Sequence, residues 1–422
     1  MTEELKSIEK NQVWELVCQP KSKKPIDVKW IYKIKTNPKG KVFKYKARLV
    51  ARGFLQKVGI DYRDVFAPVA RIETIRTVVA IASLKNWTMH QLDVKCAFLN
   101  GPLDEEVYVT QPPGFSIVGR ESKVLRLSKA LYELKQPRAW NKKIEGFMMK
   151  IGFDKCSCEF GVYVRSKSVG NIIIVCLYMD DLLITGGNKG EITKLKRELM
   201  NEFEMTDMEV LSYFLGLEFK KTESCILMHQ SKNATEILKI FNMVECNLAA
   251  TPNEAGLVLE REGKEDKVDE TEFKHIVGSL RYLCHSRAYL EFVVGLVSRY
   301  TKRPRIPHLL AAKRILRFIK GTINTGILFP NKDNNNSEEL VGYTDANWGG
   351  DRDDRKSTIG YIFMYGATPI SWSSKKQSIV ALSTCEAEYV VAAMSACQVV
   401  WLDTLLQELK IKESDGVKLF CG

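Results

Sequence analysis

Two adjacent carboxylates, Asp180 and Asp181, lie between the apolar segments 172–177 and 182–184. Placing two neighbouring negative charges beside buried strands is costly unless they stay at an exposed turn or bind a cation. An ordinary Asp-Asp β-turn is one interpretation, because Asp is common in turns. A cation site is the other, and it requires further carboxylates from elsewhere in the chain.

Asp93 is the candidate partner of this acidic pair. In the strand-like segment 91–94 (QLDV), alternation directs Leu92 and Val94 to one face and Asp93 to the other. A partly exposed residue at a strand end is the alternative. Three carboxylates at the ends of two strands would form the hard oxygen site that Mg²⁺ prefers. Two such ions about 3.5–4 Å apart suit in-line phosphoryl transfer.

A second acidic pattern occurs near the end of the sequence. Asp345 lies in a strand-like segment, and Glu388 follows the start of an apolar helix. Ser383 and Glu386 have the spacing of a capping box, which is sufficient to explain Glu386. Glu388 lies beyond the cap, so Asp345 and Glu388 together could begin another metal site. The buried stripe of this helix is expected to comprise Ala387, Val390, Val391 and Met394.

The composition favours an anionic partner. Lys and Arg number 63 against 51 Asp and Glu, which gives a formal net charge of +12 over 422 residues. A positive field of this size attracts nucleic acid or an anionic membrane surface. The chain is long enough for two or three domains, each with its own core.

Targeting and redox signals are weak. The 11 cysteines are scattered, and the Cys156–Cys158 spacing is too tight for a usual zinc site. The start of the sequence is charged, and the apolar run at 171–177 is much shorter than a membrane span. We therefore expect reduced thiols, no membrane partner, and an intracellular protein, either cytoplasmic or nuclear.

Hydrophobic periodicity divides the chain into a large α+β region, a helical connector and a smaller α/β region. A basic hairpin is predicted at 29–35 and 42–50, around a turn at 37–40. Further predictions are helices at 75–84, 131–150 and 191–203, a strand pair within 171–185, a linker at 250–271, and three helical stretches ending at 320. The remaining predictions are a loop at 331–337, a helix from 384, and strands at 339–348, 358–365, 369–373 and 417–421.

Several long blocks in the same order resemble the copia-type reverse transcriptase of LTR retrotransposon Pol polyproteins. The resemblance extends from Trp14 to about Phe219. The matching blocks are 44–53 (KYKARLVARG), 61–70 (DYRDVFAPVA), 91–101 (QLDVKCAFLNG), 107–115 (VYVTQPPGF), 131–140 (LYELKQPRAW) and 178–181 (YMDD).

This resemblance implies an α+β fold, the right-hand polymerase with fingers, palm and thumb, followed by a helical connector and a partial RNase H-like α/β domain. The implied bounds are 1–249 for fingers and palm, 250–330 for linker and helical thumb or connection, and 338–422 for the RNase H-like domain. Asp93, Asp180 and Asp181 would be the catalytic metal ligands for two Mg²⁺ ions, with Mn²⁺ as a substitute.

Substrate contacts are also implied by the resemblance. Phe98 would exclude a 2′-hydroxyl beneath the incoming sugar, although an ordinary core Phe is equally consistent. Gln136 lies in the stretch that resembles the nucleotide-contacting helix. Arg48 could clamp a triphosphate bidentately, with a solvated charged strand as the alternative. The primer-grip hairpin would comprise Leu215, Gly216 and Leu217, where Gly permits a close backbone approach.

Aromatic residues interleave with basic ones along the predicted basic hairpin. Tyr32, Phe43 and Tyr45 suit contacts with nucleic acid bases and backbone, and suit plain strand packing equally.

Residues 340–401 resemble the copia-type RNase H domain, with Asp345 and Glu388 as two of its carboxylates. In the family the next carboxylate follows the strand matched by 418–421, where this sequence has Gly422. The resemblance therefore implies an incomplete, C-terminally truncated nuclease site. Asp351, Asp353 and Asp354 lie in a polar loop and are expected to be solvated turn residues.

Three functions compete. The first is an RNA-directed DNA polymerase that uses an RNA template, a DNA primer and deoxynucleoside triphosphates. The second is a catalytically inactive transposon remnant that only binds nucleic acid. The third is a scaffold protein with no nucleic-acid role. The three carboxylates favour the first, and the charge of +12 counts against the third. The sequence does not determine the oligomeric state.

Overall fold

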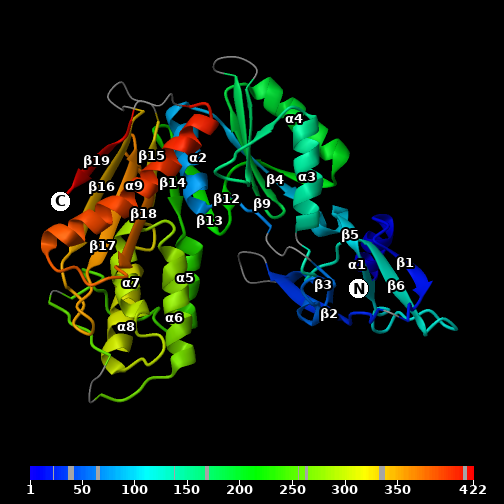
Figure 1. Ribbon diagram of the computed structural model, residues 1–422, viewed down its shortest axis with the longest axis horizontal. Helices are drawn as coiled ribbons and strands as arrows, with labels where there is room; N and C mark the ends of the chain where they lie inside the picture. The colour runs from blue at the N-terminus through cyan, green and yellow to red at the C-terminus, as the bar shows by residue number, and fades with distance from the viewer. Residues whose placement is uncertain are drawn as a thin grey trace.

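The computed structural model describes residues 1–21, 23–36, 42–62, 67–136, 138–166, 171–254, 256–261, 265–331, 338–411 and 416–422. Within them, helices and five sheets form four packed regions, with the two termini at opposite ends (Figure 1). The turn predicted at 37–40 and most of the predicted loop at 331–337 lie outside the described residues, as does the side chain of Phe43.

The N-terminal region contains two small sheets. One has the order β1 (Trp14–Cys18), β6 (Lys123–Lys129), β5 (Pro102–Val109), and α1 (Thr2–Lys10) precedes it. The other is the antiparallel hairpin β2 (Val28–Thr36) and β3 (Val42–Ala51), which confirms the predicted basic hairpin. The 3₁₀ turn η1 (Gly53–Leu55) follows it.

The central region is a six-stranded antiparallel sheet with helices on both faces. The helices α3 (Arg138–Lys150) and α4 (Lys189–Glu202) cover one face, and α2 (Ile72–Leu84) covers the other. Leu92, Leu182 and Ile184 pack toward α3 and α4, whereas Leu183 packs with α2, as alternation in strands requires. The sheet order is β11 (Met205–Val210), β4 (Met89–Val94), β10 (Asp181–Gly186), β9 (Ile172–Tyr178), β8 (Val162–Ser166), β7 (Asp154–Lys155).

One predicted helix is shorter than expected. The pattern predicts helix over 131–150, but α3 begins only at Arg138. Tyr132 instead bridges to Val50 of β3, and its carbonyl accepts from the Ala51 N–H at 2.9 Å. Through these backbone contacts, the segment before α3 is attached to β3 of the N-terminal region.

The third region joins a helical cluster to a four-stranded sheet. The helices α5 (Ser231–Ile240), α6 (Glu270–Leu283), α7 (Glu291–Ser298) and α8 (Ile306–Gly321) share one apolar core. Helix α5 precedes position 249 but packs with α6–α8, which follow it. The sheet order is β12 (Tyr213–Phe214), β13 (Leu217–Lys221), β14 (Cys225–His229), β15 (Gly326–Pro330), and η3 (Ala288–Leu290) precedes α7. Strand β15 ends at 330 and pairs with β14, which precedes 249.

The C-terminal domain has the order β18 (Thr368–Lys376), β17 (Thr358–Tyr365), β16 (Leu340–Asn347), β19 (Lys418–Cys421), with β19 parallel to β16. Its helix α9 (Thr384–Glu408) packs on β16. The Ser383 Oγ accepts from the Glu386 N–H at 3.1 Å, which confirms the helix cap. Met394 is exposed, so its place in the predicted buried stripe is wrong, and Ser395 is buried instead.

Among the described residues, α9 alone is long and apolar enough to cross a membrane by length and composition. The sequence pattern did not single it out. Its buried residues Leu402, Leu405 and Leu406 belong to a core shared with β17 and β18. These residues pack α9 on the sheet, whereas 28% of its apolar window as a whole is buried.

Candidate functional site

The pairing of β4 with β10 places Asp93 directly opposite Asp181. Leu92 and Val94 pack toward α3 and α4, so Asp93 lies on the other face, as the alternation predicts. Asp181 in turn pairs with Tyr178 across a two-residue turn formed by Met179 and Asp180. The backbone therefore brings all three aspartates to one end of the central sheet.

The turn that carries Asp180 is fixed from both sides. The Trp140 indole N–H donates to the Met179 carbonyl at 2.8 Å, and the Val94 N–H donates to the Asp180 carbonyl at 2.8 Å. Met179 has φ 54°, a left-handed conformation that is unfavourable for a non-glycine residue. Backbone strain of this kind persists only where the surroundings enforce it, and it clusters at functional sites.

Asp181 is electrostatically perturbed. Burial is the main cause that raises its pKa to about 6; Asp180 and Asp93 also act to raise the pKa, and a hydrogen bond from the Gln91 amide at 3.0 Å acts to lower it. All three aspartates are half-buried. Their mutual repulsion means that a cation bound between them would relieve an unfavourable arrangement of charge.

The carboxylates are not gathered into a preformed metal site. No group of three or more His, Cys, Asp or Glu side chains within the described ranges lies close enough together to hold a metal ion. The donors are nevertheless hard oxygens on one sheet end, the class that Mg²⁺ prefers. The residue types and the strand register of these three aspartates fit a divalent cation. Their side chains would have to rotate to complete its ligand set.

The predicted substrate residues Arg48 and Phe98 are linked by a residue that the sequence did not single out. The Arg48 guanidinium lies 5.0 Å from the ring centroid of Tyr132, and Phe98 packs edge-on against the same ring at 5.8 Å. Arg48 is exposed on β3, while Phe98 is half-buried in η2 (Ala97–Asn100). Tyr132 thus positions both side chains.

Gln136 is buried, and its amide is occupied within the protein. Its Oε1 accepts from the Gln56 amide at 3.1 Å, and its Nε2 donates to the Asp61 carbonyl at 2.6 Å. These bonds fix the loop after η1 to the start of α3. The geometry gives Gln136 a positioning role for this loop.

Two exposed aromatics lie on the basic hairpin. Tyr32 is 67% exposed and Tyr45 is 76% exposed, so neither ring is used in strand packing. The packing interpretation is therefore wrong for these two residues.

Leu215 and Gly216 form the tight turn between β12 and β13, with φ 51° and 74°. The Tyr282 hydroxyl of α6 donates to the Leu215 carbonyl at 2.8 Å. A Cβ added at Gly216 would lie 1.7 Å from that hydroxyl oxygen. The positive φ therefore favours glycine at position 216, and a larger residue would displace the Tyr282 hydroxyl. Leu217 is buried.

Gly216→Ala is expected to lower the free energy of unfolding by about 2–3 kcal/mol, because strain at positive φ adds to displacement of Tyr282. Gly114→Ala is the matched control, since Gly114 has φ 80° with nothing within 4 Å of an added Cβ. Urea unfolding of both variants measures the difference. Equal losses would show that the Tyr282 contact contributes nothing.

In the C-terminal domain, Glu388 approaches the backbone next to Asp345. Glu388 Oε1 accepts from the N–H of Ala346, the residue after Asp345, at 3.0 Å, and its buried Oε2 has no hydrogen-bond partner among the described residues. Gly422 lies on the other side, where an added Cβ would be 3.0 Å from Asp345 Oδ1. Position 422 is therefore beside Asp345, but glycine supplies no ligand.

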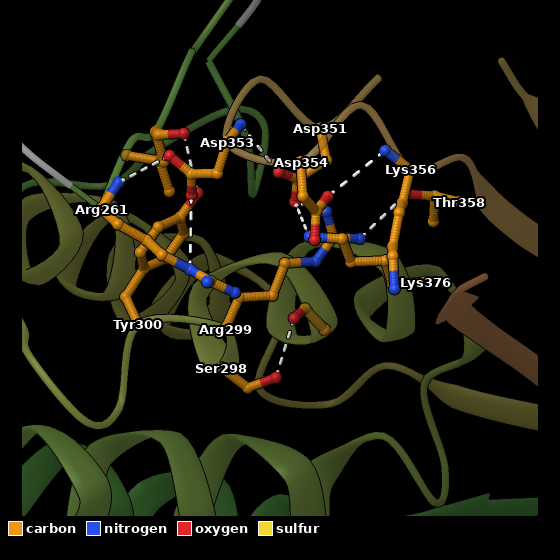
Figure 2. A network of polar contacts seen from close by, with 12 residues as sticks. Arg261, Ser298, Arg299, Tyr300, Asp351, Asp353, Asp354, Lys356, Thr358 and Lys376 are labelled. Carbon is orange, nitrogen blue, oxygen red and sulfur yellow. Dashed lines mark hydrogen bonds and ion pairs between the residues drawn. The ribbon is translucent and has the colours of Figure 1, made fainter. Parts of the chain in front are cut away.

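The prediction that Asp351 is a solvated turn residue is wrong. Asp351 is 5% exposed, and its Oδ2 accepts from Arg299 Nη1 at 2.9 Å and Lys376 Nζ at 2.6 Å (Figure 2). Burial alone would raise the pKa of Asp351, but Lys376 and Arg299 outweigh burial and hold it below its usual value. Lys376 also pairs with Asp354 at 2.7 Å. These contacts join the loop after β16 to α7 and β18.

Comparison with known proteins gives consistent matches. Residues 11–255 match the family model described as reverse transcriptase (RNA-dependent DNA polymerase). The chain is 39% identical over 431 residues to the retrovirus-related Pol polyprotein from transposon TNT 1-94 of Nicotiana tabacum, covering 100% of this chain and 32% of that protein.

Two further relatives extend this similarity. The Pol polyprotein from transposon RE1 of Arabidopsis thaliana is 39% identical over 415 residues, covering 97% of this chain and 28% of that protein. The transposon Ty1-H Gag-Pol polyprotein of Saccharomyces cerevisiae is 28% identical over 396 residues, 87% of this chain and 21% of that protein. The chain thus spans about a third or less of the length of these relatives.

Proposed function

Because this chain belongs to the reverse transcriptase family, as the corresponding region of a copia-type retrotransposon Pol polyprotein, we propose that it is an RNA-directed DNA polymerase. The observation that carries the proposal is the direct pairing of Asp93 with Asp181 beside the strained turn at Asp180. The six-stranded sheet with α2, α3 and α4 is then the palm. The N-terminal sheets are the fingers, and the helices α5–α8 are the thumb and connection.

The proposed reaction is nucleotidyl transfer to a primer 3′-hydroxyl on an RNA template. Two Mg²⁺ ions held by Asp93, Asp180 and Asp181 would activate that hydroxyl and stabilise the leaving pyrophosphate. Asp93 and Asp181 are presented by paired strands, so the backbone ladder fixes their separation. Trp140 and Val94 hold the Asp180 turn, which limits the reorganisation needed when substrate binds.

Side chains outside the palm would orient the nucleotide. Arg48 extends from the fingers hairpin and presents a forked donor suited to a triphosphate. Tyr132 supports this guanidinium on one side and the Phe98 ring on the other. Phe98 would lie beneath the sugar and discriminate against a 2′-hydroxyl. The Leu215–Gly216 turn would contact the primer, with Tyr282 holding its backbone.

We also propose that the C-terminal domain is RNase H-like. Its support is the strand order with β19 parallel to β16, together with the approach of Glu388 to the backbone beside Asp345. These two carboxylates would form part of a nuclease metal site. The partners proposed are an RNA template, a DNA primer and deoxynucleoside triphosphates, in an intracellular setting.

The direct test is primer extension by the purified full chain. A DNA oligonucleotide annealed to an RNA template is incubated with Mg²⁺ and the four deoxynucleoside triphosphates, and products are resolved by length. Extension that depends on template, Mg²⁺ and deoxynucleotides is expected. Tight, salt-sensitive binding to the primer–template with no extension would support the nucleic-acid-binding remnant instead.

The raised pKa of Asp181 predicts a pH-dependent stability in the metal-free protein. The folded state holds this proton up to a pKa of about 6, whereas the unfolded chain releases it near 3.8. The contribution of Asp181 to the free energy of unfolding is therefore fully present below about pH 4 and is lost as pH rises through 6. Asp181→Asn removes this loss, so it should be more stable than wild type at pH 7 by on the order of 1 kcal/mol.

Thermal unfolding at pH 4 and pH 7 with a chelator present measures this effect. The stability difference between Asp181→Asn and wild type should grow as pH rises. Asp154→Asn, an exposed carboxylate on β7 of the same sheet, is the control and should show no such trend. If the stability difference between Asp181→Asn and wild type is the same at both pH values, the raised pKa of Asp181 is contradicted.

A further inference from the structure

We propose that the C-terminal domain has a function apart from hydrolysis, as a structural part of the polymerase. Strand β18 and helix α9 hold the palm helix α2 and the loop before β8 in place, and α2 backs the sheet that carries Asp93 and Asp181. This inference rests on the proposed polymerase function only where primer extension is measured. For the structure itself, we infer that these contacts keep the palm folded.

Helix α2 is buried on all sides. Every residue from Thr74 to Leu84 is buried, including the polar Thr74, Arg76 and Thr77. A helix at the surface of a domain keeps a polar, exposed face, whereas a helix buried all round lies within a core. One side of α2 packs on the palm strands, and the other contacts β15 and β18 (Figure 1).

The contact between α2 and β18 is centred on Arg76. Arg76 is 2% exposed; its Nε donates to the Ile370 carbonyl at 2.7 Å, and its Nη1 donates to the His285 carbonyl at 3.0 Å. Its guanidinium lies 3.6 Å from the ring centroid of Trp372. Burial lowers the pKa of Arg76 to about 10, so it stays charged at neutral pH. A buried cation with these partners becomes strongly unfavourable if β18 moves away.

A second contact secures the loop that leads into β8. Glu408, at the end of α9, accepts from the N–H of Ser157 at 3.1 Å and of Cys158 at 3.2 Å, and from the Ser157 hydroxyl. Burial alone would raise the pKa of Glu408, but these hydrogen bonds hold it below its usual value. The Trp401 indole donates to the Cys158 carbonyl at 3.3 Å, and Arg71 lies over the Trp401 ring at 4.9 Å.

The apolar core has no boundary between the palm and the C-terminal domain. A single cluster of buried side chains runs from the palm strands through α2 and β12–β15 to β16–β18 and α9. Leu183 of the palm and Leu405 of α9 belong to this cluster. Two domains that fold independently would each close their own core, so the continuity indicates one cooperative unit.

Hydrogen–deuterium exchange of the full chain tests this function without requiring activity. Glu408→Gln and Glu386→Gln make the same chemical change on the same helix. Glu408 contacts the palm, whereas Glu386 accepts only from Leu382 of its own domain among the described contacts. We expect Glu408→Gln to speed exchange of the α2 amides by about tenfold, because a charge-assisted contact is lost, and Glu386→Gln to change it less than twofold.

Trp372→Ala gives a second, stronger test from β18, and it should speed α2 exchange more than Glu408→Gln does. The proposal fails if either variant speeds exchange only within α9 and β16–β18 while α2 stays at the wild-type rate. Primer extension at elevated temperature gives a separate readout, which Glu408→Gln should lose before Glu386→Gln. A wild-type chain that extends no primer would overturn the polymerase proposal and leave the exchange result to stand.

Discussion

Asp180→Asn is expected to abolish primer extension, with a loss of at least about 10³-fold in rate, because removal of one anionic ligand costs several kcal/mol of transition-state stabilisation. The substitution is nearly isosteric, and the Asp180 carbonyl keeps its hydrogen bond from the Val94 N–H. The fold should therefore be retained. Single-turnover extension on the RNA template measures the loss.

Asp154→Asn is the matched control for this variant. It removes the same charge from β7, at the far edge of the same sheet, where the side chain is exposed. It should extend primers at the wild-type rate. Asp180→Asn should still bind the primer–template with the wild-type salt dependence, since the basic residues are unchanged. Equal extension by Asp180→Asn and wild type would end the polymerase assignment.

Asp351→Asn is expected to lower the free energy of unfolding by roughly 3 kcal/mol, because it leaves two buried cations without their shared anion. Arg299 and Lys376 both donate to Asp351 Oδ2, and the Asp351 side chain is 3% exposed. Thermal or urea unfolding measures the loss. The effect is large for a charge substitution because none of the three groups is well solvated.

Asp354→Asn provides the comparison for Asp351. Asp354 also pairs with Lys376, at 2.7 Å, but its side chain is 33% exposed. Its loss should cost less than about 1 kcal/mol, as is usual for ion pairs open to solvent. If both variants lose stability equally, burial of Asp351 is not the source of its contribution.

Local sequence patterns predicted much of the central site. Alternation around Asp93 and the two apolar runs beside Asp180 and Asp181 depend on neighbouring residues only, and the observed strands follow them. The helix from Thr384 and the strand 358–365 were predicted for the same reason. Periodicity records which face of an element is buried, and that information is local.

Long-range partners could not be predicted in this way. Arg299 and Lys376 bury Asp351, yet neither is near it in sequence, and a run of polar residues alone indicates a solvated loop. Tyr132 links Arg48 with Phe98 through a segment whose composition favours helix. The same holds for Arg76, whose partner carbonyl belongs to Ile370.

The separation of Arg76 and Ile370 has a consequence for synthesis of the chain on the ribosome. The two residues lie 294 positions apart, so α2 leaves the ribosome long before β18 exists. At ordinary elongation rates this interval is roughly 15–60 s. During that time the part of this apolar helix that packs on β18 has no cover from that strand. Chaperones that bind emerging apolar segments would therefore be expected to occupy α2 until translation reaches β18.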